Sequence, residues 1–119
     1  MSLIKSHEDL EIWKLSIHLV KEIYLITRSF PLDEKYVLSF QMRRAGISIP
    51  SNIAEGAGRK SKKEFINFLN ISLGSLSELE TQIIISKELE YISDYTEIKA
   101  LIKRIRVMIS SLINKLSSP

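Results

Sequence analysis

Apolar residues recur every three to four positions along most of this 119-residue chain, and this spacing restricts the fold more than any other feature. Four segments with this spacing should form helices, at about residues 8–29, 33–58, 61–90 and 94–116. Only four glycines and three prolines occur, too few for an all-β protein. Because the connections are short, neighbouring helices should run antiparallel. The sequence therefore predicts an all-α, up-down-up-down four-helix bundle that forms a single domain over residues 1–119.

The first predicted helix carries two adjacent apolar stripes. One stripe contains Leu10, Trp13, Ile17, Val20 and Tyr24. The other contains Ile12, Leu19, Ile23, Ile26 and Phe30. A helix that packs only inside a monomeric bundle needs one such stripe, somewhat over 100° wide. The second stripe therefore predicts a further buried contact, and we expect a homo-oligomer.

Capping residues predict where the later helices begin. Asp33 can cap the second helix, and Asp94 can cap the fourth. Ser61 and Glu64 have the spacing of a capping box at the start of the third. Phe30 should end the first helix, because the residue before a proline is pushed out of the α region.

Glycine and proline predict the irregular positions. Pro50 falls inside the second helix and should produce a kink or a short break there. Gly56 and Gly58 should end that helix in the left-handed conformation. Gly74 lies among serines in the third helix, where small residues would let a neighbouring backbone come close.

Residue types that carry catalysis or bind metals are scarce. The chain has no cysteine, which excludes disulfides, thiolate zinc sites and cysteine nucleophiles. His18 and Glu22 are four residues apart and could share a metal, but two ligands do not make a site, and a solvated position is the simpler interpretation. The sequence also lacks a di-iron Glu-x-x-His motif, a nucleophile elbow and a glycine-rich phosphate loop. We therefore expect no enzyme, no catalytic residue, no metal and no cofactor.

The hydropathy of the chain predicts a soluble protein. Its densest apolar run, residues 83–85, is far shorter than the roughly 18 residues of a membrane span. Residues 1–9 carry acids where a signal peptide would have its apolar stretch. We expect a cytoplasmic protein with no membrane partner.

Positive charge is concentrated in one segment. Residues 41–63 contain six bases and one acid, a net charge of +5, whereas the remainder carries 11 bases and 13 acids. The six bases are Arg43, Arg44, Arg59, Lys60, Lys62 and Lys63. Bases at the start of a helix are disfavoured by the helix dipole, so their presence calls for another reason, such as phosphate binding. A solvated surface run is the alternative.

The same segment contains a polar motif that breaks helix rules at several adjacent positions. Its members are Ser48, Pro50, Asn52, Glu55 and Gly56. In the structural interpretation, the polar side chains bond carbonyls that Pro50 leaves without donors, and Glu55 pairs with Arg43, Arg44 or Arg59. In the functional interpretation, the motif forms a groove for an anionic partner.

These residues carry a resemblance to a known family. The matching segments are Asp9-Leu-Glu-Ile-Trp-Lys14, Phe30-Pro31, Gln41-Met-Arg-Arg-Ala45, Ser48-Ile-Pro-Ser-Asn-Ile-Ala-Glu-Gly56, Gly58-Arg59, Phe65-Ile-Asn-Phe-Leu69 and Leu73-Gly-Ser-Leu-Ser-Glu-Leu-Glu80. From about Asp9 to Tyr91 the chain resembles the four-helix-bundle family first met as proteins encoded in intervening sequences of 23S ribosomal RNA genes. The fourth helix resembles the family only in its amphipathic pattern.

The resemblance implies a four-helix bundle that assembles into a ring, typically a pentamer. The family is also similar to the accessory variability protein of diversity-generating retroelements, a basic ring that binds nucleic acid and a reverse transcriptase. From the residues and the resemblance together, we expect a non-enzymatic homo-oligomeric module that binds RNA or DNA through its basic segment. The alternative is a protein-interaction scaffold that recruits a partner protein, such as a reverse transcriptase, and has no nucleic-acid role.

Overall fold

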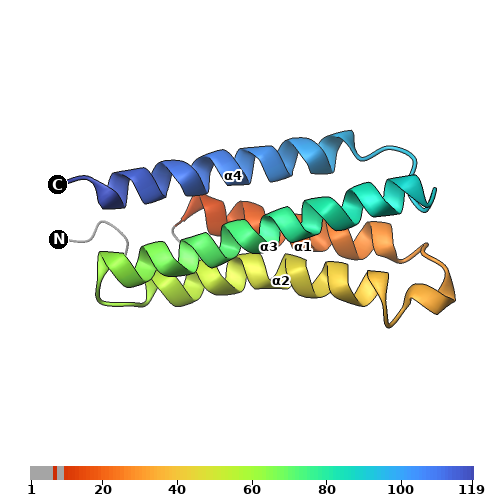
Figure 1. Ribbon diagram of the computed structural model, residues 1–119, viewed down its shortest axis with the longest axis horizontal. Coiled ribbons are helices and arrows are strands. Elements are labelled where there is room, and N and C mark those ends of the chain that lie inside the picture. The colour runs from red at the N-terminus through yellow and green to blue at the C-terminus, as the bar shows by residue number, and fades with distance from the viewer. Residues whose placement is uncertain (1–6, 8–9) are drawn as a thin grey trace.

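The computed structural model describes residue 7 and residues 10–119, and four α-helices make up most of this part. They are α1 (Glu11–Thr27), α2 (Leu38–Ala57), α3 (Lys62–Glu88) and α4 (Thr96–Ser117), with a short 3-10 helix, η2 (Leu32–Glu34), before α2. The helices lie side by side along a molecule that measures 49 × 23 × 19 Å (Figure 1). No β-strand occurs in the described ranges. The all-α prediction is confirmed, and the arrangement is compatible with a four-helix bundle.

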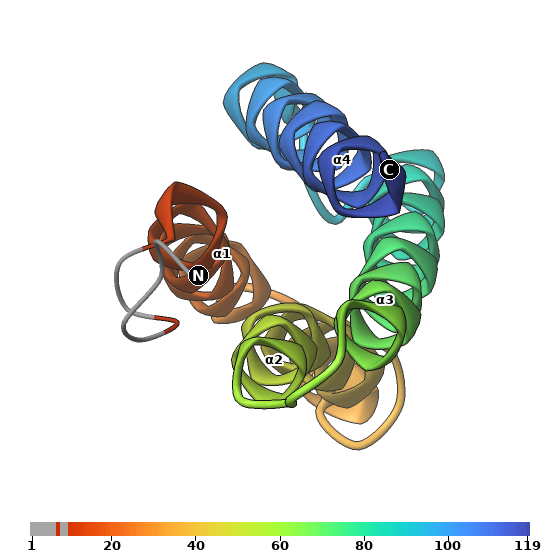
Figure 2. The same cartoon turned by 90° about the vertical axis from the view of Figure 1, so that its left-hand side faces the viewer.

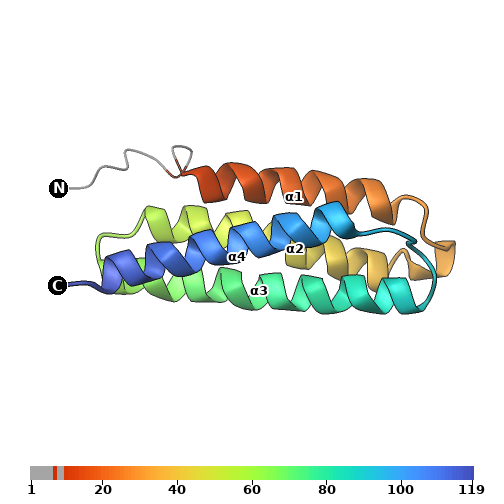
Figure 3. The same ribbon diagram turned by 90° about the horizontal axis from the view of Figure 1, so that it is seen from above.

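The helices surround the core in chain order, as the view along the molecule shows (Figure 2). Helix α1 contacts α2 and α4, α3 contacts the same two, and the closest packing joins α2 to α3. From above, α4 lies between α1 and α3 (Figure 3). The connection from α2 to α3 lies at the same end of the molecule as the C-terminus, and the other two connections lie at the opposite end (Figure 1).

Apolar side chains from all four helices form one core. In the stripe of α1 that contains Leu19 and Ile23, these two side chains are fully buried and Ile26 is partly buried, whereas Ile17 of the other stripe is 44% exposed. The fully buried large side chains are Leu19, Ile23, Met42, Ile49, Ile53, Leu69, Leu76, Leu79, Ile83, Ile102, Ile105 and Ile109. Among the described residues, no helix is long and apolar enough to cross a membrane.

The predicted cap at Ser61 is confirmed, whereas Asp94 bonds the first residue of α4 but Tyr95 holds the N-cap position. The Ser61 hydroxyl accepts the Glu64 amide at 3.1 Å, and the Glu64 carboxylate reaches back to the Ser61 hydroxyl at 3.2 Å. The Asp94 carboxylate accepts the amide and the hydroxyl of Thr96, at 3.0 and 2.7 Å. These hydrogen bonds lower the pKa of Asp94 below its usual value. The predicted start of the first helix at Glu8 lies outside the described residues.

The predicted start of the second helix at Asp33 is wrong, because α2 begins five residues later at Leu38. The intervening segment turns through η2, and Glu34, not Asp33, interacts with the start of α2. Its carboxylate accepts the Leu38 amide at 3.4 Å and the Tyr91 hydroxyl at 2.9 Å. The second bond ties η2 to the end of α3 and raises the pKa of Tyr91 above its usual value.

The predicted left-handed glycine at the end of α2 is also wrong. Gly58 caps that helix with a right-handed φ of −84°, and no described glycine has a positive φ. The left-handed residue is Glu90 (φ 62°), just beyond α3, where the Tyr91 amide donates to the Ser86 carbonyl as in a Schellman motif. Glycine at the end of α2 is therefore not explained by a left-handed conformation, and for Gly56 the reason is close packing against α3.

Helix α2 continues without interruption past Pro50, so the predicted short break is wrong and a kink stays a prediction. The predicted close approach of a backbone is found at Ser72, whose hydroxyl donates to the Ile49 carbonyl, but not at Gly74, where a Cβ atom would meet nothing within 4 Å. Gly74 faces outward, whereas its neighbours Ser72 and Ser75 face α2.

Candidate functional site

Three of the six predicted basic residues lie together at the turn between α2 and α3. Lys60 is in the turn, and Lys62 and Lys63 begin α3 beside the cap residue Ser61. All three lysines are exposed. Within the described chain, no ion pair includes any of them. We call these residues the lysine turn.

Arg59 is adjacent to the lysine turn but is held by neighbours within the chain. Its guanidinium pairs with Glu55 at 3.0 Å and lies 3.9 Å from Glu64. It also covers the Phe68 ring, 4.9 Å from the ring centre. The predicted pairing of Glu55 is thus with Arg59. The two carboxylates offset the charge of Arg59, which makes it a weaker phosphate ligand than the lysines.

Arg43 and Arg44 are far from the lysine turn and on different sides of α2. The Arg43 side chain donates to the Thr27 hydroxyl at 2.9 Å and stacks over Tyr24 at 4.4 Å, so it joins α2 to α1. Arg44 lies 3.8 Å from Glu78 and so faces α3. From Arg43 to Arg59 the helix rises by roughly 24 Å. The structure therefore does not bring the six predicted residues into one site.

The polar motif in α2 packs against α3. The Ser48 hydroxyl bonds the Ser75 hydroxyl at 2.8 Å and accepts from the Asn52 amide at 2.9 Å. The buried Ser72 donates to the Ile49 carbonyl at 3.0 Å. Serines and asparagine thus form a hydrogen-bonded seam between the two helices, which supports the structural interpretation of the motif.

The hydrogen bonds around Pro50 differ in one detail from the prediction. Ser51 donates to the Ile47 carbonyl at 2.8 Å, and Asn52 donates to the Ser48 carbonyl at 2.8 Å. Neither of these side chains reaches the carbonyl of Gly46, which is the one that Pro50 deprives of its amide donor. The polar side chains therefore reinforce the turns beside Pro50 and do not replace the missing bond.

Gly56 allows α3 to approach α2 closely. A Cβ atom at this position would lie 2.8 Å from the Phe68 Cβ and 2.9 Å from the Phe65 ring. The Phe68 Cβ is fixed to the backbone, so the helices would have to separate to make room. The glycine is needed for space and not for an unusual φ.

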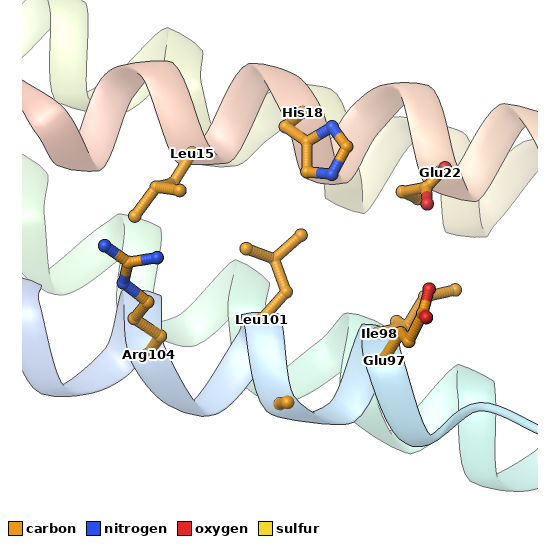
Figure 4. A pocket seen from close by; sticks show the side chains of 8 residues that line it. Leu15, His18, Glu22, Glu97, Ile98, Leu101 and Arg104 are labelled. Carbon is orange, nitrogen blue, oxygen red and sulfur yellow. The ribbon is translucent and has the colours of Figure 1, made fainter.

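A second region lies between α1 and α4, where a groove of about 330 Å³ opens to solvent. Leu15, His18 and Glu22 line it from α1, and Glu97, Leu101 and Arg104 line it from α4 (Figure 4). A second hollow of about 450 Å³ lies farther along, between the start of α1 and the later part of α4. Among the described residues, no group of three metal-ligating side chains is placed to hold an ion, here or elsewhere.

Sequence reasoning missed this groove because its walls come from the two ends of the chain. His18 and Glu22 looked like isolated surface residues on one helix. The available signal was that Glu97, Leu101 and Arg104 share one side of α4 at helical spacing. Nothing in the spacing showed that this side would face His18.

The chain is similar to known proteins over most of its length. Residues 8–111 match the model of the 23S rRNA-intervening sequence protein family. The chain belongs to this family. It is also similar to the crystal structure of a protein of unknown function from the S23 ribosomal protein family of Bacteroides thetaiotaomicron, with 30% sequence identity and a TM-score of 0.78. That similarity covers 86% of this chain and 97% of the other, and a comparison with curated proteins finds no match.

Proposed function

We propose that this member of the 23S rRNA-intervening sequence protein family is a non-enzymatic, homo-oligomeric module that binds RNA or DNA through the lysine turn. The observation that carries the proposal is the exposure of Lys60, Lys62 and Lys63 beside Arg59, whose own charge is already paired. Three ammonium groups within four residues, none of them paired with a carboxylate in the described part of the chain, suit a polyanion such as a phosphate backbone.

The position of the lysines at the start of α3 supports this proposal. Positive side chains there oppose the helix dipole, at a cost of a few tenths of a kcal/mol each. The free amides of the first helical turn attract the same anion that the lysines would bind. The arrangement therefore weakens the isolated protein slightly and favours a phosphate-bound one.

The homo-oligomer rests on the outer stripe of α1. Ile17 is 44% exposed, and Phe40 and Ile47 of the adjacent α2 are 51% and 43% exposed. Burial of these side chains against a second copy would remove apolar surface from water. Light scattering coupled to gel filtration measures the mass directly, and a 13.7 kDa monomer at micromolar concentration would contradict this part of the proposal.

The family resemblance implies a pentameric ring, and a ring would repeat the lysine turn around its axis. Several weak contacts then act together, so affinity for a long RNA should far exceed that for a short one. The proposal includes two finer features of the fold, the up-down-up-down order and a kink at Pro50. The helix order would place every lysine turn at one end of the ring.

A filter-binding experiment tests the lysine turn. The test variant carries Lys60→Gln, Lys62→Gln and Lys63→Gln, and the matched control carries Lys14→Gln, Lys21→Gln and Lys35→Gln, which removes three exposed charges elsewhere. With an RNA of several tens of nucleotides at low salt, we expect the test variant to bind about tenfold more weakly or worse. The control should bind like the wild type. Equal losses of RNA affinity in both variants would show that only the net charge of the protein matters, and this result would contradict the proposal.

A protein-interaction scaffold is the second candidate function. The observation that favours it is a run of exposed apolar side chains just before and at the start of α2, with Leu32 90%, Tyr36 79% and Val37 59% exposed. Exposed apolar clusters of this kind mark protein interfaces. If wild-type protein binds no RNA at low salt, this function takes the place of the first.

A further inference from the structure

The groove between α1 and α4 exposes part of the apolar core to solvent. Leu15 lies opposite Arg104 and Leu101 lies opposite His18, and both leucines are only partly buried although they pack against the core (Figure 4). Farther along, Met108 and Leu112 line the second hollow in the same way. A groove whose floor is apolar and whose two walls are helices lying side by side has the shape that accepts a third helix.

The charges along this groove are ordered. Glu22 of α1 and Glu97 of α4 lie on opposite walls near one end (Figure 4). Arg104 lies seven residues beyond Glu97 on α4, which is two helical turns or about 10 Å. At one end of the groove, each wall therefore carries a carboxylate. Two helical turns away, the α4 wall carries a positive charge.

We infer that this groove binds an amphipathic α-helix from another protein. Its contact face would place a basic side chain between Glu22 and Glu97 and an acidic side chain opposite Arg104, with leucine-like residues between them. Positions i and i+7 of a helix lie on the same face about 10 Å apart, which matches the spacing of Glu97 and Arg104. The complementary charges fix the orientation of the helix, and the apolar floor supplies the buried area.

The length of the groove sets the length of its occupant. The lining residues of α4 extend from Glu97 to Lys115, which corresponds to roughly 27 Å of helix or about 18 residues. A nucleic acid does not suit this surface, because the floor offers leucine side chains and two carboxylates repel phosphates. The groove and the lysine turn are therefore separate binding surfaces for different classes of partner.

The probe is a synthetic 18-residue helical peptide with a fluorescent label. It carries Lys at one contact position, Glu seven positions later, Leu at the contact positions between them, and Ala or Gln on the outer face. We expect fluorescence anisotropy to show saturable binding to the wild-type protein at micromolar concentration. The Arg104→Glu variant should bind this peptide about tenfold more weakly, because it sets two carboxylates against each other.

A charge exchange separates the proposed contact from a general loss of folding. A second peptide with Lys in place of its Glu should bind the Arg104→Glu variant better than it binds the wild type. The matched control is Lys103→Glu, which reverses a charge on the adjacent exposed residue outside the groove lining. It should leave the affinity for both peptides unchanged.

Several results would overturn the inference. These are no binding of the first peptide at millimolar concentration, equal binding to wild type and Arg104→Glu, or failure of the exchanged peptide to restore affinity. A changed oligomeric mass of Arg104→Glu in light scattering would assign the groove to a second copy. The inference does not rest on RNA binding, so the variant that lacks the three lysines should bind the first peptide like the wild type.

Discussion

The polar motif in α2 and the lysine turn that follows it are adjacent in the sequence but differ in their contacts. In the motif, Ser48 and the Ile49 carbonyl bond serines of α3, and Gly56 makes room for the aromatic rings of the same helix. Four residues beyond Gly56 the lysine turn begins, where the side chains are exposed and none forms an ion pair within the described chain. The difference shows that adjacent unusual residues can have different environments, since one part packs against α3 and the other places positive charge in solvent.

Among substitutions in the polar motif and the lysine turn, a change at Gly56 should have the largest effect on stability. Gly56→Ala should destabilise the protein by about 1–3 kcal/mol, because the new Cβ atom would overlap Phe68 and Phe65. Urea denaturation followed by circular dichroism measures this change. A variant as stable as the wild type would mean that the two helices can move apart without cost, and the close packing would lose its importance.

Asn52 should show the next largest effect. Its amide donates to the carbonyl and the hydroxyl of Ser48, and the side chain is half-buried. Asn52→Ala should therefore lower the free energy of unfolding by about 1 kcal/mol. If the melting temperature of this variant stays the same while its RNA affinity falls, Asn52 contributes to RNA binding. The polar motif would then not be limited to packing.

A substitution at Gly74 sharpens the comparison, because it should raise the free energy of unfolding whereas the same substitution at Gly56 should lower it. It lies in the middle of α3, it is exposed, and a Cβ atom there would meet nothing within 4 Å. Gly74→Ala should stabilise the protein by about 0.5–1 kcal/mol through the unfolded chain and helix propensity. A loss of stability in the same denaturation assay would show that this surface is covered in the assembled protein.

The lysine turn should contribute least to stability. Replacement of Lys60, Lys62 and Lys63 by Gln removes no contact within the described chain, so the free energy of unfolding should change by less than about 0.5 kcal/mol. Thermal melts of this variant and the wild type provide the measurement. A large loss would place these lysines in the packing of the protein, against the division proposed above.

Much of the fold follows from local sequence rules. The helical periodicity identified all four helices, and Ser61 and Asp94 act at the helix starts where capping rules placed them. The rules failed where a distant contact decided the local structure. Glu34 accepts a hydrogen bond from Tyr91, which is distant in the sequence but lies at the same end of the molecule, and the chain turns through η2 before α2 begins. Gly56 is explained by two aromatic residues of the next helix, which no pattern within α2 reveals.

The candidate site was only partly predictable for a similar reason. Net charge along the chain located the basic segment, but it could not show that Arg43 stacks on Tyr24 or that Glu55 neutralises Arg59. Those pairings depend on which faces of α2 meet α1 and α3. The three lysines stay exposed because the turn between α2 and α3 lies at one end of the molecule (Figure 1).

The most direct test of the lysine turn is the salt dependence of RNA binding. Affinities of the wild type and of the variant with Gln at residues 60, 62 and 63 would be measured at several salt concentrations. Each phosphate contact with a single strand contributes about 0.7 to the slope of log affinity against log salt concentration. We predict that the slope of the variant is shallower by about 2 or more, since three contacts are lost from each bound subunit. Parallel lines with equal slopes would contradict the assignment of phosphate binding to these lysines.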